Sequence, residues 1–442
     1  MTIPTTTRLA AEGSETSGPA AHGFDDVAAL FRPIFADIAE TAVRRETDRD
    51  LPFDAVHALK AAGFGALRIP TEFGGFGLSL EELFVLLIEL GAADSNLPQL
   101  LRGHVAFVET QLALPKTERR DRWFRRIADR DILFGNAQAE LGEATNPSTA
   151  ITERDGRLLL NGRKFYSTGT LYADWIWSMA HHEGELVALA VSATAAGVSR
   201  IDDWDGFGQR LTGSGTTVFE DVEIDPAEIL PSSVNDAVRP HAYIAGLYQL
   251  ILLAALAGIG RAAEREAIDF VRPRTRTFGV PGLSSPREDP LVQRVVGKVS
   301  SLRFAVDATV LAAVRGLERT DTHRRRDETD EAAYQASLIG VYEAQQVVID
   351  LVLSATSDLF EVGGASAVTT GRQLDRLWRN ARTISSHNPA ILRERAIGDY
   401  HLNGTPPITR LHAPAQAQSV EETAQPTEET ARPTDESAQP AD

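Results

Sequence analysis

The chain has 442 residues, 43% of them hydrophobic and 24% charged, which is enough to bury a sizeable core in one large unit or in two or three domains. Its formal net charge of −18 argues against a nucleic-acid-binding protein, because binding to phosphates needs a basic surface. The sequence has no cysteine, which excludes disulfides, iron–sulfur clusters, thiolate metal sites and a cysteine nucleophile. This composition suits a cytoplasmic protein that has no nucleic acid as a partner.

The N-terminal part of the chain reads as a leader followed by helices. Residues 1–24 lack the apolar core of a signal peptide and predict a disordered leader. In residues 24–46 the apolar side chains recur on one face at helical spacing, and residues 52–63 begin with proline and end with glycine, the usual helix punctuation. We therefore expect an N-terminal helical domain over residues 25–130.

The pattern changes to strands near residue 131. Asp155-Gly156 and Asn161-Gly162 flank a short apolar run, which is a strong hairpin signal. Further strands are expected at residues 185–193 and 216–224, with Gly, Asp and Pro between them. Residues 131–232 therefore predict a β domain.

Long helical patterns return after the β domain and indicate a C-terminal bundle over residues 233–405. Residues 241–260 carry no charge and are long enough to span a bilayer, but they are rich in Ala and Gly and run into a polar helical pattern. We therefore expect a buried bundle helix there and no membrane contact. The expected helical segments are 240–271, 290–318, 331–360 and 372–384, which suits a four-helix bundle.

The last part of the chain, residues 406–442, has the composition of a disordered acidic tail. Residues 422–428, 429–435 and 436–442 are three copies of a seven-residue repeat, and a proline in every copy forbids a coiled coil. Residues 413–442 contain seven acidic residues and one arginine, so they supply −6 of the net charge. Such a segment has too little apolar surface to fold.

Two motifs in the sequence could mislead. Residues 258–263, GIGRAA, match the start of a dinucleotide fingerprint, but they lie inside a helical run with no preceding strand. We therefore expect no nicotinamide site. His181 and His182 lie in an expected strand-turn loop without a carboxylate or thiolate pattern around them, which indicates a solvated turn and no metal site.

Six short stretches resemble, in the right order, the acyl-CoA dehydrogenase superfamily. The resemblance covers residues 25–405 and implies a mainly α fold with a central β domain. It adds that the middle domain is β-barrel-like, that the bundle has four helices, and that the protein is a homotetramer. The stretches are IPTEFGGFGLS (69–79), FGNAQAE (134–140), NGRKFYSTG (161–169), GQRLTGSGTTVFEDVEI (208–224), RTRTFG (274–279) and LFEVGGASAV with RLWRNART (359–368 and 376–383).

The resemblance also implies a bound flavin. Thr168 offers a hydroxyl and a backbone N–H that could bond the N5/O4 edge of the ring, and Asn136 and Gln138 could bond its pyrimidine end. Turn formation is the alternative role for Thr168 and Asn136.

The flavin phosphate is expected at RTRTFG, where Arg274 and Arg276 offer forked donors. A solvated basic helix start is the alternative reading of these arginines. Phe278 and Trp204 are further expected cofactor contacts. Ser366 stands where some relatives have an arginine that helps with the phosphate, so the choice between FMN and FAD stays open.

The sequence departs from the dehydrogenases at the catalytic base. An acyl-CoA dehydrogenase removes an α-proton with a carboxylate, normally a Glu just after the last conserved helix. That position falls at Asn388, beside His387, and residues 229–263, where other relatives carry the base, contain no Glu. Asparagine is no general base near neutral pH. A dehydrogenase or oxidase with an unrecognised base therefore remains only the alternative.

The departures resemble another branch, the flavin-dependent monooxygenases related to dibenzothiophene monooxygenase and the alkyl sulfone monooxygenases. In that branch a separate NAD(P)H-dependent reductase supplies reduced flavin, usually FMN. The flavin reacts with O2 to a C4a-hydroperoxide, which oxygenates a small apolar or aromatic substrate at sulfur, nitrogen or carbon. The stretches that carry this resemblance are RGHVAFVE (102–109), FYSTGTLYADWI (165–176), DDWDGFGQRLTGSGT (202–216) and ISSHNPAILRERAIGDYHLNG (384–404).

This branch assigns roles to two histidines. A hydroperoxide survives only where water is excluded and fixed donors hold its oxygens, and His387 and His104 are the candidates to flank it. Thr168, helped by Ser167, would hold the N5/C4a side. A core or helix-cap histidine is the alternative for His104, and a turn residue is the alternative for His387. Tyr166, Phe207 and Asn388 are expected to line the substrate pocket.

Overall fold

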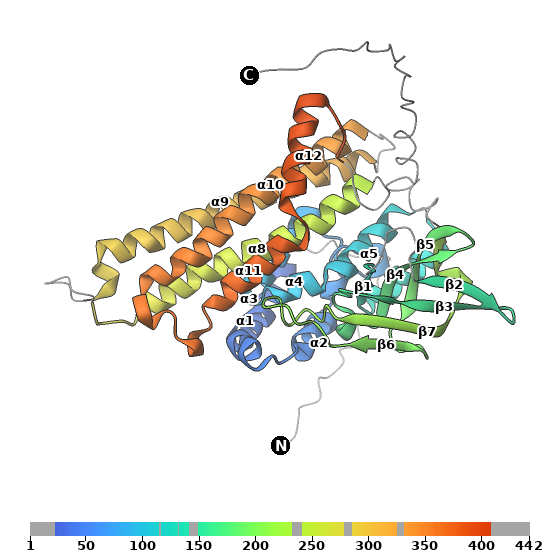
Figure 1. Cartoon of the computed structure of the whole chain (residues 1–442), viewed down its shortest axis with the longest axis horizontal. Coiled ribbons are helices and arrows are strands. Elements are labelled where there is room, and N and C mark those ends of the chain that lie inside the picture. The colour runs from blue at the N-terminus through green and yellow to red at the C-terminus, as the bar shows by residue number, and fades with distance from the viewer. Residues whose placement is uncertain are drawn as a thin grey trace, which may run out of the picture. The chain divides into compact units, whose positions relative to one another are not determined.

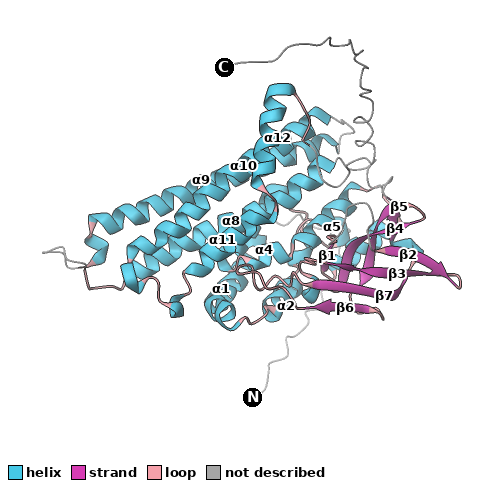
Figure 2. Cartoon of the chain, in the orientation of Figure 1, coloured by secondary structure: helices cyan, strands magenta, loops and turns pink. Residues whose placement is uncertain are grey.

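Three groups of elements follow one another along the chain: helices, then strands, then long helices (Figures 1 and 2). They belong to one unit that ends at Pro407. The computed structural model describes residues 23–407 except 115, 131, 141–148, 232–240, 278–284 and 325–330. The expected acidic repeats, and nearly all of the expected leader, lie outside the described residues. The expected mainly α fold with a central β domain is confirmed.

The N-terminal helices form where capping residues and periodic apolar residues predict them. Helix α3 starts with a capping box in which the Ser79 side chain accepts from Glu82 N and the Glu82 side chain accepts from Ser79 N. Helix α2 ends at Gly63, whose φ of +91° suits a glycine C-cap. The helices are α1 (Phe24–Asp48), α2 (Phe53–Ala62), α3 (Leu80–Ala93), α4 (Asn96–Leu100), α5 (Arg102–Ala113) and α6 (Glu118–Ala128).

The strands build one mixed sheet in the order β6-β7-β3-β2-β4-β5-β8, and β1 pairs in parallel with β4. Its apolar face encloses a core of its own, which includes Leu160, Ile176 and Phe219. The strands are β1 (Phe134–Ala137), β2 (Ala150–Arg154), β3 (Arg157–Lys164), β4 (Trp175–His182), β5 (Glu185–Ser192), β6 (Val198–Ile201), β7 (Thr216–Ile224) and β8 (Ile229–Pro231).

One of the two hairpin signals was placed correctly. Asp155 and Gly156, both with positive φ, form the turn between β2 and β3. Asn161-Gly162 is not a turn: it lies inside β3, at an irregularity in the pairing with β7. Gly162 is required there because a Cβ would lie 2.5 Å from Thr149 Cα. His181 and His182 end β4 and do not lie in the turn that follows.

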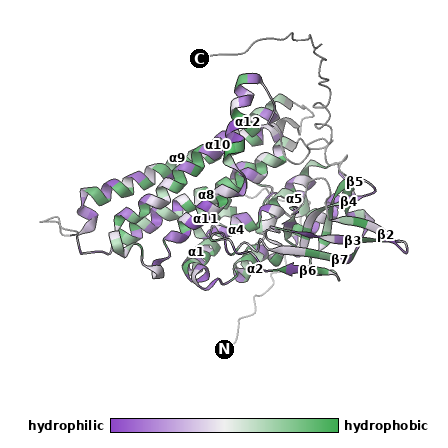
Figure 3. Ribbon diagram, in the orientation of Figure 1, coloured by the Kyte–Doolittle hydropathy of each residue, from purple (hydrophilic) through white to green (hydrophobic). Residues whose placement is uncertain are grey.

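The C-terminal helices are α8 (His241–Val271), α9 (Pro290–Arg324), α10 (Glu331–Asp358), α11 (Asp375–His387) and α12 (Ala390–Asn403). Helices α8, α9 and α10 pack on one another, and α11 packs on α8 and α10, as the bundle prediction required (Figure 1). Along α9 and α10 hydrophilic and hydrophobic residues alternate (Figure 3). Helix α12 is a fifth helix that the sequence pattern did not indicate.

The uncharged helix α8 lies in the core. In the part of the chain that the structure describes, two helices, over Ala242–Val271 and Ala332–Val362, are long and apolar enough to cross a membrane by length and composition. The most apolar stretch of the first is 83% buried within the chain. Gly258, part of the misleading GIGRAA motif, has a packing role, since a Cβ there would lie 2.6 Å from Gly91 Cα in α3. The expected domain boundaries remain predictions within this unit.

Candidate active site

The sequence predicted a helix that ends at residue 384, with His387 in the loop that follows. In the structure His387 is the last residue of α11. Only Asn388 and Pro389 separate it from α12. The Asn388 side chain donates to Gln249 Oε1 (2.9 Å), and its backbone oxygen accepts from Gln345 Nε2 (3.2 Å). Helices α8 and α10 therefore fix the point at which α11 ends. Asn388, which was expected to line a substrate pocket, braces this junction.

The imidazole of His387 contacts a guanidinium that the sequence analysis did not single out. Arg102 Nη2 lies 3.0 Å from His387 Nε2. Arginine can only donate, so Nε2 accepts and the proton of the neutral ring resides on Nδ1. The pair joins the start of α5 to the end of α11, two segments 285 residues apart.

The surroundings keep His387 neutral. Burial by the surrounding protein, and then the neighbouring Arg102 charge, lower the pKa of His387 to about 3. Its side chain is nevertheless exposed to solvent, whereas Arg102 is buried. His387 can therefore meet a ligand as a neutral imidazole.

Asn136 lies on the other side of Arg102. It is buried in β1, and its backbone N–H donates to Thr168 O (3.0 Å). The Tyr248 hydroxyl donates to Asn136 Oδ1 (3.4 Å), and the Arg102 guanidinium lies over the Tyr248 ring, 5.3 Å from its centroid. Gly103 makes this approach possible, since a Cβ there would lie 2.6 Å from Asn136 Cβ.

The Thr168 hydroxyl ends a chain of hydroxyl groups. Thr212 Oγ1 donates to Gln209 O (2.9 Å), Ser214 Oγ lies 2.7 Å from Thr212 Oγ1, and Thr168 Oγ1 lies 2.9 Å from Ser214 Oγ. The Thr168 proton points to Ser214 or to Tyr166 O, 3.3 Å away. In both cases the protein uses the Thr168 proton, and a lone pair of its oxygen can accept from a ligand. Its backbone N–H is already bonded to Tyr166 O (2.8 Å).

Ser167 has a turn-forming role in the structure. Its hydroxyl donates to Lys164 O (3.4 Å), its N–H donates to Gly215 O, and its carbonyl accepts from Thr170. The side chain is fully buried. None of the described hydrogen bonds of Ser167 is to His387.

His104 does not join this group. Its Nε2 lies 2.8 Å from Gly65 O, which only accepts, and its Nδ1 accepts from Phe134 N–H (3.2 Å). Both ring nitrogens are therefore bonded to backbone, and burial lowers the pKa of His104 to about 4. This geometry favours the alternative that the sequence left open, a core histidine, over the expectation that His104 flanks a reacting oxygen.

Aromatic side chains gather beside the Thr168 loop. Tyr166 and Phe207 are each 55% exposed; Tyr166 meets Trp204 edge-on (6.2 Å between centroids) and Phe207 stacks on Trp378 (6.3 Å). The loop that carries Phe207 is tied to α11, because Arg379 Nη1 donates to Phe207 O (2.9 Å). These exposed rings can line a site for an apolar or aromatic ligand.

The expected phosphate-binding residues lie elsewhere in the chain. Arg274 follows the C-terminal end of α8, donates to Ser366 Oγ (3.0 Å) and lies over the Phe270 ring. Arg276 is exposed, and Phe278 lies outside the described residues. From Tyr248, which contacts Asn136, to the end of α8 the helix rises about 35 Å. The chain therefore does not bring the arginines to the Asn136 group.

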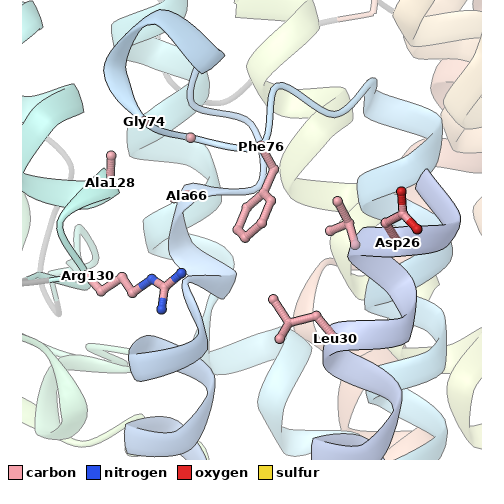
Figure 4. A pocket seen from close by; sticks show the side chains of 9 residues that line it. Asp26, Leu30, Ala66, Gly74, Phe76, Ala128 and Arg130 are labelled. Carbon is pink, nitrogen blue, oxygen red and sulfur yellow. The ribbon is translucent and has the colours of Figure 1, made fainter. Parts of the chain in front are cut away.

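Two further features fall outside this group. Gln138 is half-buried and donates to Trp177 O (3.4 Å). A cavity of about 290 Å³ lies beside α1, where Phe76 and Leu30 face it between Asp26 and Arg130 (Figure 4). None of the expected site residues lines this cavity. Among the described residues no cluster of His, Cys, Asp and Glu could hold a metal ion.

Sequence reasoning missed Arg102 and Tyr248. A signal for Arg102 exists: it is the only charged residue between Asp94 and Glu109, in a run that is otherwise apolar or uncharged. A charge in such a run is unusual in a buried helix. Tyr248 gave no comparable signal, because a tyrosine in an apolar helix is common in protein cores.

Comparisons with known proteins identify the family of the chain. A family model described as the N-terminal domain of acyl-CoA dehydrogenase matches residues 27–131, and one described as its C-terminal domain matches residues 250–390. A dibenzothiophene monooxygenase of Rhodococcus qingshengii is 27% identical over 87% of this chain and 95% of its own length. A probable FMNH2-dependent monooxygenase, SfnC of Pseudomonas putida, is 28% identical over 86% and 95%.

Solved structures give the same result. TdsC from Paenibacillus sp. A11-2, in a complex with FMN and indole, has a TM-score of 0.79 and 26% identity, covering 86% of this chain and 98% of that one. The methanesulfinate monooxygenase MsuC from Pseudomonas fluorescens has a TM-score of 0.78 and 26% identity, covering 86% and 97%. The chain therefore belongs to the acyl-CoA dehydrogenase superfamily, in the branch that contains these monooxygenases.

Proposed function

We propose that this chain is the oxygenase of a two-component system, which receives reduced FMN from a separate NAD(P)H-dependent reductase and oxygenates a small apolar or aromatic substrate at sulfur, nitrogen or carbon. The observation that carries the proposal is the group around His387. A histidine and an asparagine stand where a dehydrogenase needs a carboxylate base. None of the described hydrogen bonds of Arg102, His387 or Asn388 involves Asp or Glu. The monooxygenase relatives support the same reaction class.

The residues of the site fit FMN in its reduced form. The Thr168 oxygen can accept a hydrogen bond, because the protein already uses its proton. The N5 atom of a flavin carries a hydrogen only when the flavin is reduced, so Thr168 suits reduced flavin better than oxidised flavin. Bound reduced FMN supplies the two electrons with which O2 is activated for the transfer of one oxygen atom. SfnC is named as a probable FMNH2-dependent monooxygenase, and TdsC was solved with bound FMN; both support this cofactor.

His387 supplies proton control beside the ring. Its Nδ1 carries the proton and its Nε2 lone pair is held by Arg102, so the residue can donate from one nitrogen and accept at the other. Asn136, held by Tyr248, adds fixed amide hydrogen bonds. Tyr166, Trp204 and Phe207 contribute aromatic walls that exclude water, which oxygen transfer requires.

The site needs a second chain to bind the phosphate. About 35 Å of helix separates Tyr248 from the end of α8, where Arg274 follows, and FMN is shorter than this distance. An Arg274 from a neighbouring subunit therefore holds the phosphate of the flavin whose ring lies at Asn136. We expect a homotetramer, as in the fold family. Exposed apolar side chains suited to subunit contacts are Leu291 and Phe304 on α9, and Ile391, Leu392 and Leu402 on α12.

The compartment follows from the same proposal. An oxygenase that depends on diffusing reduced flavin must work beside its reductase, where NAD(P)H is available. A chain without cysteine is compatible with a reducing compartment. We therefore place the protein in the cytoplasm.

The experiment that tests this function combines the purified chain, FMN, NADH and an unrelated flavin reductase under ¹⁸O2, with dibenzothiophene and indole as substrate probes. We expect one ¹⁸O atom per product molecule, only when the reductase is present, and none with His387→Ala. A different result would favour a dehydrogenase: both probes remain unchanged, and an acyl-CoA thioester reduces bound flavin under nitrogen.

A further inference from the structure

Arg102 differs from the other buried arginines of the chain. Among the described residues, five arginines are buried: Arg45, Arg68, Arg102, Arg120 and Arg376. Four of them form salt bridges, with Asp94, Glu109, Asp121 and Glu266 respectively. Arg102, with 6% of its surface exposed, forms no described salt bridge. A buried charge without a partner is strongly destabilising, so the presence of Arg102 needs a physical explanation.

The guanidinium of Arg102 also has unused hydrogen-bonding capacity. Of its five N–H groups the described hydrogen bonds use one, from Nη2 to His387 Nε2. Nε is buried and has no hydrogen-bond partner among the described residues. The Tyr248 ring beneath the guanidinium supplies a cation–π contact but no charge that balances it. Burial without a counter-charge lowers the pKa of Arg102 to about 10, so the group stays a cation at neutral pH.

The position of this cation points to a ligand. Arg102 lies between His387 on one side and the Tyr248–Asn136 pair on the other, within the candidate active site. His387 is exposed to solvent, so a ligand that contacts its imidazole would lie next to the Arg102 guanidinium. A ligand with a planar or forked oxyanion would take up unused N–H groups and balance the charge at the same time.

We propose that Arg102 is a substrate-binding residue that selects for a substrate carrying an anionic oxyanion group, such as a carboxylate or a sulfinate, beside its apolar body. This inference rests on the proposed function and narrows its substrate class. The anion offsets the Arg102 charge, which after burial is the second cause that lowers the pKa of His387. Substrate binding therefore makes His387 Nε2 more basic and couples recognition to proton control.

The test uses titration calorimetry on the full chain without flavin, with benzoate as the anionic probe and benzamide as its neutral counterpart. We expect benzoate to bind at least about tenfold more tightly than benzamide, since a charge-assisted bond contributes that much. Arg102→Met keeps an unbranched apolar stem but removes the guanidinium, and should abolish the preference. Arg102→Lys keeps the charge but not the fork, and should retain part of it.

Arg120→Met is the matched control, because Arg120 is as buried as Arg102 but is paired with Asp121. The control should keep the preference for benzoate and should lower the urea midpoint of unfolding. Arg102→Met should leave that midpoint unchanged or raise it, because it removes an unbalanced buried charge. A preference for benzoate that survives in Arg102→Met, or a midpoint that falls as far as in the control, would overturn the proposal.

A second arm separates substrate from flavin as the source of the anion. In the presence of saturating FMN, wild-type chain should still prefer benzoate, and Arg102→Met should bind FMN as wild type does. Loss of FMN affinity with no change in the benzoate preference would assign Arg102 to the cofactor and refute the inference. Because the first titration needs neither flavin nor oxygen, it can succeed even if the proposed monooxygenase reaction fails.

Discussion

Two histidines that look alike in the sequence have opposite surroundings in the structure. His104 is enclosed, with both nitrogens bonded to backbone of Gly65 and Phe134. His387 lies at the end of α11, exposed on one side and bonded to a single arginine. The sequence could not separate them, because the acceptor of His104 is a backbone carbonyl 39 residues away in a short turn. A hydrogen bond to a backbone atom cannot be predicted from the pattern of side chains in a sequence.

The role of His104 predicts a particular dependence of stability on pH. Its folded pKa of about 4 lies below the ordinary value of about 6.5, so between these pH values the unfolded chain binds a proton that the native chain does not. Wild type therefore loses stability as pH falls from about 6.5 to about 4. His104→Leu should cost about 2–4 kcal/mol at pH 7, since two backbone groups lose their partner. By pH 5 that deficit should shrink by about 2 kcal/mol.

Urea unfolding of both proteins at pH 7 and pH 5 checks this prediction. His387 is unchanged in both proteins, so its own titration cancels in the difference. An equal deficit at the two pH values would show that His104 takes up a proton in the native state.

The hydroxyl chain at Thr168 makes a separate prediction about flavin. Thr168→Val removes the acceptor. It should weaken the binding of reduced FMN by about tenfold and change the affinity for oxidised FMN little. Thr168→Ser keeps the hydroxyl and serves as the control. Anaerobic and aerobic fluorescence titrations give the two dissociation constants. Equal weakening of both redox forms would mean that Thr168 only shapes the turn.

At the scale of elements, the site depends on the close contact between α5 and β1. Gly103 is the residue that permits it, because a Cβ would meet Asn136 Cβ at 2.6 Å. Gly103→Ala should destabilise the chain by about 1–3 kcal/mol through overpacking and should displace Asn136. Gly297→Ala in α9 is the matched helical control, since a Cβ there meets nothing within 4 Å, and it should be neutral or stabilising by up to about 1 kcal/mol. Chemical denaturation distinguishes the two, and equal effects would contradict the packing argument.

The elements also show what a sequence can and cannot predict. Periodicity and punctuation predicted the helices, the β domain and the hairpin at Asp155, because these signals are local. The end of α11 was predicted three residues too early, since packing of Asn388 on α8 and α10 extends the helix to His387. Asn161-Gly162 resembled a turn because its sequence suits one, but pairing with β7 and the close approach of Thr149 place it inside a strand. In each case a long-range contact overrode a local preference.

At the scale of the whole molecule, we propose that two chains share one site, because α8 separates Arg274 from the Asn136 group of the same chain. The family resemblance suggested Arg274 and Arg276 as phosphate-binding residues, and the length of α8 is what separates them from the Asn136 group of their own chain.

Shared sites predict complementation between two inactive variants. Arg274→Gln and His387→Ala chains should each be inactive, whereas co-expressed chains should regain roughly a quarter of wild-type activity, because random mixing completes that share of the sites. Light scattering should give the mass of a tetramer for all samples. Mixed oligomers without any recovery would place both residues in the same chain's site and contradict the shared arrangement.

We propose above all that the C-terminal end of α11, with His387, is part of a site where reduced FMN meets O2. Rapid mixing of the chain and reduced FMN with oxygenated buffer, followed by flavin absorbance, tests it most directly. We predict that the absorbance of oxidised flavin returns more slowly with the protein than with free FMN, and that His387→Ala shortens the delay. Oxidation at the rate of free FMN in wild type, with and without a substrate probe, would contradict the account.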